Sequence, residues 1–124
     1  MPRQSLSDAD IARLRDILAA IETVQRYCVR VSEARFVTDY VLQDAVVRRV
    51  MIVGEASSKL SAEAREMLPQ IEWTSIISMR HILVHDYSDV DQGTLWRTIR
   101  HDLPELKKLL LRSVDFAKGV VIDP

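Results

Sequence analysis

The segment from Trp73 to Tyr87 contains the residues whose types and spacing could do chemistry. It holds Arg80 and two of the three histidines, His81 and His85, among residues that are otherwise mostly apolar. Burying ionisable side chains on an apolar helix costs free energy unless they find partners. A functional cleft is the simplest reason for a protein to tolerate that cost, so this segment is the first candidate for a site.

The residue types suit the cleavage of a phosphodiester bond. A histidine titrates near neutral pH, so His85 could take a proton from a ribose 2′-hydroxyl or give one to the departing 5′-oxygen. Arg80 stays charged and could stabilise the additional negative charge of a pentacoordinate transition state. Attack by the 2′-hydroxyl needs neither a metal nor a protein nucleophile, so no cofactor is expected. The products would be a cyclic 2′,3′-phosphate and a 5′-hydroxyl.

On an ideal helix, Arg80 and His85 point in different directions. At about 100° per residue they lie about 140° apart, with His81 between them and about 40° from His85. The other side of the helix is apolar and should face the core; it consists of Ile76, Met79, Ile82 and Leu83. Arg80 and His85 therefore need a groove to act on one phosphate. A two-fold dimer that apposes two such faces would supply it.

Other interpretations of these residues stay open. His81 and His85 have the i, i+4 spacing of some metal-ligand pairs, but there is no glutamate between them and no obvious third ligand. Arg80 and His85 could instead serve the structure alone, through ion pairs with Asp86 or Glu55.

The elements that must position these residues are predicted to be helices. The chain has only three glycines and four prolines and lacks alternating strand-like runs, which favours helix almost throughout. Ser7 and Asp10 resemble a capping box, and the apolar spacing after them predicts a helix of about five turns. A second helix is expected from about Glu33 to Leu60. Gly54 within it would allow another helix to approach closely.

The second half of the chain predicts further helices. Ser61 would cap a short helix that must stop before Pro69. The next helix, from about Glu72 to His85, would carry the candidate site. Asp91 would then cap a long final segment.

Pro104 would kink or divide that final segment, and Gly119 would end it. The helices together predict an all-α fold, an up-and-down bundle of four to five helices.

The composition is that of one folded domain. The chain has 124 residues, 48% of them hydrophobic, which excludes a disordered chain and predicts a single domain over residues 1–124. The formal net charge is −1, so no overall basic field marks a non-specific nucleic-acid binder. The one cysteine, Cys28, is expected to be buried and suits a reducing compartment. Without a signal core or an apolar run of about 20 residues, we expect a soluble cytoplasmic protein and no membrane partner.

The spacing Arg80-x4-His85-x-Tyr87 resembles the Arg-x4-His-x-Tyr signature of HEPN toxins. It is most similar to the HepT-like group, which is encoded beside minimal nucleotidyltransferases. Other segments also fall where that group has them, namely Val53-Gly54-Glu55-Ala56, Ile71-x-Trp73, Trp96 and Leu103-Pro104-x-Leu106. The resemblance covers nearly the whole chain, which is therefore interpreted as one HEPN domain.

The resemblance implies a bundle that forms a homodimer with its Arg/His pairs lining a shared cleft. It implies a metal-independent endoribonuclease, the toxin of a toxin–antitoxin pair, with Arg80 and His85 as catalytic positions. It also implies an antitoxin partner, a minimal nucleotidyltransferase that transfers AMP from ATP onto Tyr87. The group usually has asparagine where this chain has His81, so His81 is an accessory candidate of uncertain role. Glu55 could orient an active-site residue or serve only as a structural partner to an arginine.

Tyr87 lies just beyond the expected end of its helix, beside Ser88 and Asp89, where another enzyme could reach its hydroxyl. AMP at this position would bring bulk and negative charge next to Arg80 and His85. The alternative is an ordinary tyrosine at a helix boundary. For the whole chain, the alternative function is a non-catalytic HEPN module that binds a nucleotide or a nucleotidyltransferase partner.

Overall fold

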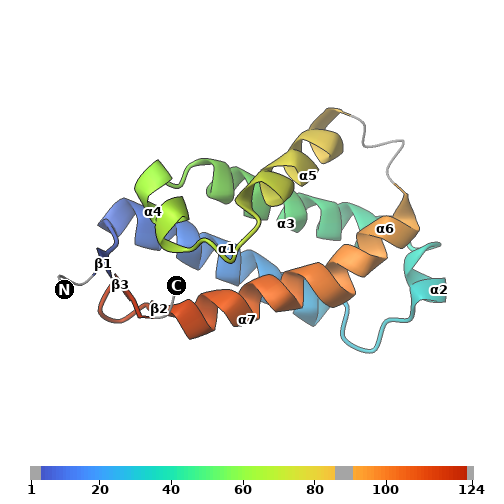
Figure 1. The fold of residues 1–124 in the computed structure, drawn as a ribbon. Helices are drawn as coiled ribbons and strands as arrows, with labels where there is room; N and C mark the ends of the chain where they lie inside the picture. The colour runs from blue at the N-terminus through green and yellow to red at the C-terminus, as the bar shows by residue number, and fades with distance from the viewer. Residues whose placement is uncertain (1–3, 86–90, 123–124) are drawn as a thin grey trace.

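The computed structural model describes residues 4–85 and 91–122, and these residues are mostly helical (Figure 1). The all-α class predicted from the sequence is confirmed. In chain order the helical elements are α1 (Asp8–Tyr27), α2 (Glu33–Phe36), α3 (Tyr40–Ser58), α4 (Ala62–Met67), α5 (Trp73–His85), α6 (Gln92–Arg97), a π-helical turn (Thr98–Asp102) and α7 (Leu103–Ser113). The strands are β1 (Gln4–Ser5), β2 (Val114–Asp115) and β3 (Val120–Val121).

The core lies where α1, α3, α5 and α7 pack together (Figure 1). α1 contributes a buried stripe at three- and four-residue steps, made of Leu14, Ile17, Ile21 and Val24. α3 is rich in valine, which mildly disfavours a helix, but burial of its apolar face outweighs that preference. Cys28 is buried, as the sequence predicts. None of the described helices is long and apolar enough to cross a membrane.

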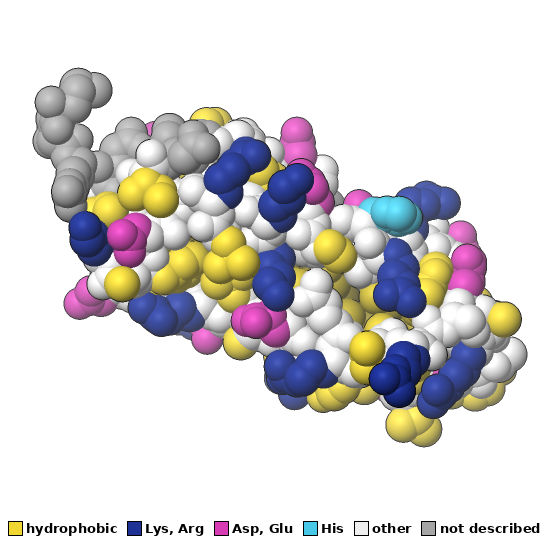
Figure 2. Space-filling model, turned by 90° about the horizontal axis from the view of Figure 1, so that it is seen from below, with side chains coloured by type: hydrophobic (Ala, Val, Ile, Leu, Met, Phe, Trp, Pro, Cys, Tyr) yellow, Lys and Arg dark blue, Asp and Glu magenta, His cyan; other side chains and the backbone are white. Residues whose placement is uncertain are grey.

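The surface mixes both signs of charge with apolar side chains. In the view from below, lysine and arginine are spread over the face rather than gathered into one field (Figure 2). This distribution agrees with the net charge of −1. Tyr40 and Val41, at the start of α3, are 74% and 81% exposed.

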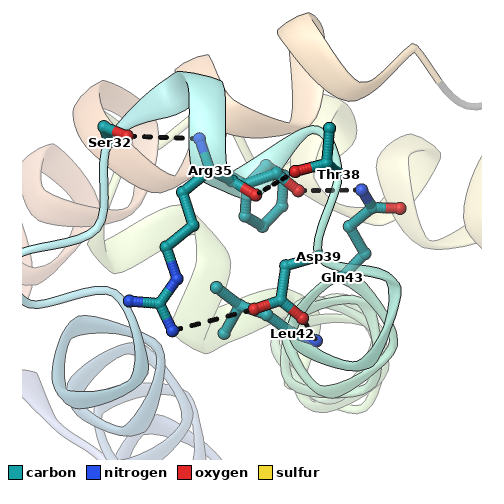
Figure 3. A network of polar contacts seen from close by, with 7 residues as sticks. Ser32, Arg35, Thr38, Asp39, Leu42 and Gln43 are labelled. Carbon is teal, nitrogen blue, oxygen red and sulfur yellow. Dashed lines mark hydrogen bonds and ion pairs between the residues drawn. The ribbon is translucent and has the colours of Figure 1, made fainter.

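The single helix predicted from Glu33 to Leu60 is wrong, because the chain breaks between α2 and α3 (Figure 3). The Asp39 carboxylate accepts a hydrogen bond from the Leu42 backbone N–H at 3.0 Å and so caps α3. The Gln43 side chain then donates to the Phe36 carbonyl, the last of α2, at 2.8 Å. A short aspartate side chain that bonds to the backbone competes with helix continuation. The break therefore has a local cause in Asp39.

The start of α1 is tied to the start of α4 by a buried carboxylate. The Ser7 hydroxyl accepts a hydrogen bond from the Asp10 N–H at 3.0 Å, as an N-cap should. The Asp10 carboxylate instead accepts bonds from the Ser61 N–H and hydroxyl at 2.9 and 2.6 Å. The predicted capping box is therefore only half formed. The second half is a contact between two helices.

The final segment is divided just before Pro104, as predicted. Asp91 caps α6 by accepting a hydrogen bond from the Gly93 N–H at 3.0 Å. Further along, the Leu103 N–H bonds to the Thr98 carbonyl, five residues back. Proline has no N–H with which to continue a regular helical ladder, and the backbone widens to a π turn immediately before it.

The predicted end of the last helix at Gly119 is wrong, because α7 ends at Ser113. Gly119 has φ 66°, a left-handed conformation that favours glycine, and lies in the turn between β2 and β3. The strands form an antiparallel sheet in the order β1-β3-β2. Strands of two residues are too short to show an alternating pattern, so the sequence gives no sign of them.

Candidate functional site

Helix α5 carries three of the candidate residues. Trp73, at its start, is only 7% exposed and anchors the helix in the core. Arg80, His81 and His85 all lie on α5, which ends at His85. The His85 side chain and residues 86–90, with Asp86 and Tyr87, lie outside the described residues.

Arg80 packs against α3 at a glycine. Gly54 is buried, and a Cβ atom built on it would overlap the Cβ of Arg80. The two helices can approach this closely only because position 54 has no side chain. The close helix approach expected at Gly54 is therefore confirmed, and the residue that approaches is Arg80.

The two sides of α5 differ in part from the expected arrangement. Leu83 is 2% exposed and belongs to the core, as expected. Ile76 and Met79 are half-buried and line a groove. Arg80 was expected to share an outward face with His81, but its stem packs on α3 while His81 is exposed. The position of α3, which an ideal isolated helix does not include, decides what Arg80 meets.

A charged cluster surrounds the crossing of α3 and α5. The Lys59 ammonium donates a hydrogen bond to the Glu55 carboxylate at 3.1 Å. This bond and the Lys59 charge hold the pKa of Glu55 below its usual value, and the positive charges of Arg80 and Arg48 lower it further against a small opposing effect of burial. We name Arg48, Glu55, Lys59 and Arg80 the α3–α5 charged cluster. It holds three cationic side chains and one carboxylate, so it is locally basic in a chain without a basic field.

The charge of Arg80 thus lowers the pKa of Glu55, but the residue that donates a hydrogen bond to the Glu55 carboxylate is Lys59. Lys59 was not singled out from the sequence. The signal that could have found it is its i, i+4 spacing from Glu55 on one helix face. Arg48 lies seven residues before Glu55, two turns back on a similar face.

The arrangement can attract and hold a phosphate group. Arg80 keeps its charge at any physiological pH and can present paired donors to a phosphate. His81, one residue on, is exposed, so a ligand could reach this part of α5. Among the residues that the structure describes, no three His, Cys, Asp or Glu side chains are grouped to hold a metal ion.

Comparison with known proteins places nearly the whole chain in one group. The family described as "Ribonuclease HepT-like" matches residues 11–112, from α1 into α7. A Methanocaldococcus jannaschii protein named as a gamma-glutamylcyclotransferase and RNase is 39% identical over 102 residues, which are 82% of this chain and 46% of that protein. This chain thus spans about half the length of that relative.

Two further relatives are matched over most of their length. A second Methanocaldococcus jannaschii protein, named as an RNase, is 32% identical over 104 residues, 83% of this chain and 95% of that protein. A Thermococcus cleftensis protein named as a ribonuclease HepT is 36% identical over 94 residues, 76% of this chain and 86% of that protein. No solved structure matches the chain.

Proposed function

The chain belongs to the HepT-like ribonuclease family, and from that premise we propose that it is a metal-independent endoribonuclease and the toxin of a toxin–antitoxin pair. The observation that carries the proposal is the α3–α5 charged cluster. In it Arg80, on the helix that also bears His85, packs against Gly54 of α3. Residues 1–124 form a single HEPN domain in this proposal. In this proposal RNA is the substrate and the protein acts in the cytoplasm.

Arg80 binds the scissile phosphate. Its stem packs at the helix crossing, so fewer side-chain conformations remain to be lost when the guanidinium binds. Glu55, held ionised by Lys59 and Arg80, is a positioning residue that favours one placement of the guanidinium. The positive charge of Arg80 stabilises the phosphorane-like transition state.

His85 moves the proton. As a base, it accepts the proton of the ribose 2′-hydroxyl while that oxygen forms a bond to phosphorus. The bond from phosphorus to the 5′-oxygen breaks, and the departing oxygen takes a proton from an acid, a second histidine or water. The products are a 2′,3′-cyclic phosphate and a 5′-hydroxyl. His81 is an accessory residue that could serve as this acid.

A homodimer completes the site in this proposal. Two copies of α5 across a two-fold axis would place two Arg80 and two His85 side chains in one cleft. The large exposed apolar residues Val37, Tyr40 and Val41 support an interface near the start of α3. Figure 1 shows this part of α3 and the end of α5 toward the same end of the bundle.

Loss of cleavage in a purified histidine variant tests the catalytic proposal. Wild-type protein incubated with single-stranded RNA in EDTA should yield fragments that end in a 2′,3′-cyclic phosphate. His85→Ala should lose at least about a hundredfold in rate, because general acid–base catalysis contributes about that much or more. His101→Ala, a histidine on the π turn, is the matched control and should cleave normally. Wild-type protein that is folded, unmodified and inactive would favour the alternative of a non-catalytic module that binds a nucleotide or a nucleotidyltransferase.

Neutralisation by AMP transfer is the second part of the proposal. The Tyr87 hydroxyl oxygen would attack the α-phosphorus of ATP on a minimal nucleotidyltransferase, lose its proton and release pyrophosphate. The attached AMP would place a negative phosphate next to Arg80 and repel the RNA backbone. Co-expression with such an enzyme should add one AMP mass to Tyr87 and stop cleavage, while Tyr87→Phe should remain unmodified and active. Full neutralisation without added mass would rule out the transfer.

A further inference from the structure

A groove beside the charged cluster is not used by the proposed catalysis. It lies between α3, α5 and the start of α7 and has a volume of about 460 Å³. Its wall is largely apolar and includes Val50, Val53, Ile76, Met79, Leu106 and Leu109. Three helical elements build its sides, together with residues 70–72 just before α5. A volume of this size lies within the range of binding pockets, roughly 300–1,000 Å³.

The rim of the groove is acidic. Glu72 lines it just before α5, Asp102 and Glu105 line it around the start of α7, and all three are exposed. Across residues 4–85 and 91–122, no ion pair engages these carboxylates and no lysine or arginine lines the groove. The groove thus has the opposite charge to the cluster around Arg80.

The largely apolar lining also contains polar groups. The Gln70 amide oxygen is buried and has no hydrogen-bond partner among the described residues, and Gln70 lines the groove. A buried acceptor of this kind costs free energy until a donor reaches it. The π turn supplies Thr98 and Asp102 to the same wall, and π turns inside helices are frequent at functional sites.

We propose that this groove binds an amphipathic helix of a partner protein whose apolar side chains are flanked by lysine or arginine. Apolar side chains of the partner would fill the groove in the manner of helix-in-groove recognition. Its cations would pair with Glu72, Asp102 and Glu105. RNA is excluded as an occupant because its phosphates would meet the three carboxylates.

The charge pattern also decides against a second copy of this chain as the occupant. A two-fold contact through the groove would place the same surface on both sides. The carboxylate rims of the two copies would then face one another, and like charges across an interface cost free energy. A cationic partner helix meets no such repulsion.

Selection from a displayed library of helix-forming peptides of about four turns tests the proposal. The full-length chain is the target. Peptides with apolar residues at i, i+3, i+4 and i+7 and flanking lysine or arginine should be enriched. When a selected peptide is added, the Met79 methyl signal should shift in NMR spectra and that of Met67 on α4 should not, because only Met79 lines the groove.

The charge of the rim is tested with a triple variant, Glu72→Gln with Asp102→Asn and Glu105→Gln. It should bind the selected peptide at least about tenfold more weakly, a loss of about 1.4 kcal/mol, and raised salt should weaken wild-type binding. The control removes three exposed carboxylates elsewhere, by Asp16→Asn, Glu33→Gln and Glu63→Gln, and should bind like wild type. RNA cleavage by the rim variant should be unchanged, which separates this proposal from the catalytic one.

Several results would overturn the proposal. One is enrichment of acidic or uncharged peptides, and another is failure to enrich any peptide. Equal binding by the rim variant and wild type would show that the carboxylates play no part. Wild-type self-association that disappears in the rim variant, measured by sedimentation velocity, would make a second copy the occupant.

Discussion

Arg80 combines a buried stem with a charge that no ion pair shorter than 4.0 Å neutralises among the described residues. Its Cβ packs at Gly54, and its charge lowers the pKa of Glu55. A side chain held at its base keeps its reach but loses much of its conformational freedom. This is the condition under which one arginine can bind a phosphate in a defined direction.

Replacing Gly54 with alanine should disturb both stability and activity. Alanine favours a helix by about 1 kcal/mol over glycine, but its Cβ would overlap that of Arg80. We expect Gly54→Ala to lower the free energy of unfolding by about 1–3 kcal/mol, as overpacked sites do, and to reduce RNA cleavage at least about tenfold. Denaturant titration and a cleavage assay provide the measurements.

Gly93→Ala is the matched control, because a Cβ there meets nothing closer than an Asp91 carboxylate oxygen at 3.4 Å. It should cleave RNA like wild type and be as stable as wild type or more stable by up to about 1 kcal/mol. A Gly54→Ala protein as stable and active as wild type would show that the close approach at Arg80 has no consequence.

At the scale of elements, α1 and α4 are joined through a carboxylate. Burial by itself raises the pKa of Asp10, but its hydrogen bonds with Ser61 and Ser7 outweigh burial and leave the pKa below its usual value of 3.8. Because the folded state holds the charged form more tightly, Asp10 stabilises the fold above the usual pKa. That contribution disappears as the pH falls through the lowered pKa of the folded state.

Removing the Asp10 charge should therefore matter at neutral pH and not in acid. Asp10→Asn should lower the free energy of unfolding by about 1–3 kcal/mol at pH 7, because a bond to a charged acceptor is lost. The difference from wild type should shrink as the pH falls below the usual pKa of 3.8 and through the lowered pKa of the folded state. Asp8→Asn, an exposed carboxylate in the same turn, is the control and should cost about 0.5 kcal/mol. Equal losses for both variants, or a loss independent of pH, would contradict this role.

At the scale of the whole molecule, two regions of opposite charge lie close together in a chain of net charge −1. The α3–α5 charged cluster is basic, and the groove lined by Glu72, Asp102 and Glu105 is acidic. Met79 lines the groove and Arg80 follows it directly along α5. An RNA would be attracted to one region and repelled by the other, which limits where it can lie.

The proposed homodimer makes a prediction at the same scale. Light scattering after gel filtration should give twice the chain mass. If each of the two Arg80–His85 pairs in the shared cleft takes Arg80 from one protomer and His85 from its partner, a mixture of Arg80→Ala and His85→Ala proteins should regain cleavage. About a quarter of the wild-type sites should be intact, since half of the randomly formed dimers would be mixed and each would hold one complete site.

The complementation has a direct control. Each variant assayed alone, at the total protein concentration of the mixture, should remain unable to cleave RNA. A stable monomer, or a mixture that remains inactive although the subunits exchange, would remove the shared cleft.

The sequence by itself determined the helical class, the caps Ser61 and Asp91, the division before Pro104 and the helix over Trp73–His85. Periodicity, caps and prolines act over one or two turns of backbone, so the residues involved are neighbours in the chain. The same local signals failed at Asp39, where one carboxylate that bonds to the backbone stopped a helix whose apolar pattern continued.

Only the tertiary structure decided which distant residues meet. The Asp10 carboxylate bonds to Ser61, 51 residues away, Gly54 lies against Arg80, and an acidic groove opens between α3, α5 and α7. A sequence shows that a residue is small or charged, but its partner depends on how whole helices cross. That choice is made by the packing of their buried faces, which is a property of the assembled core.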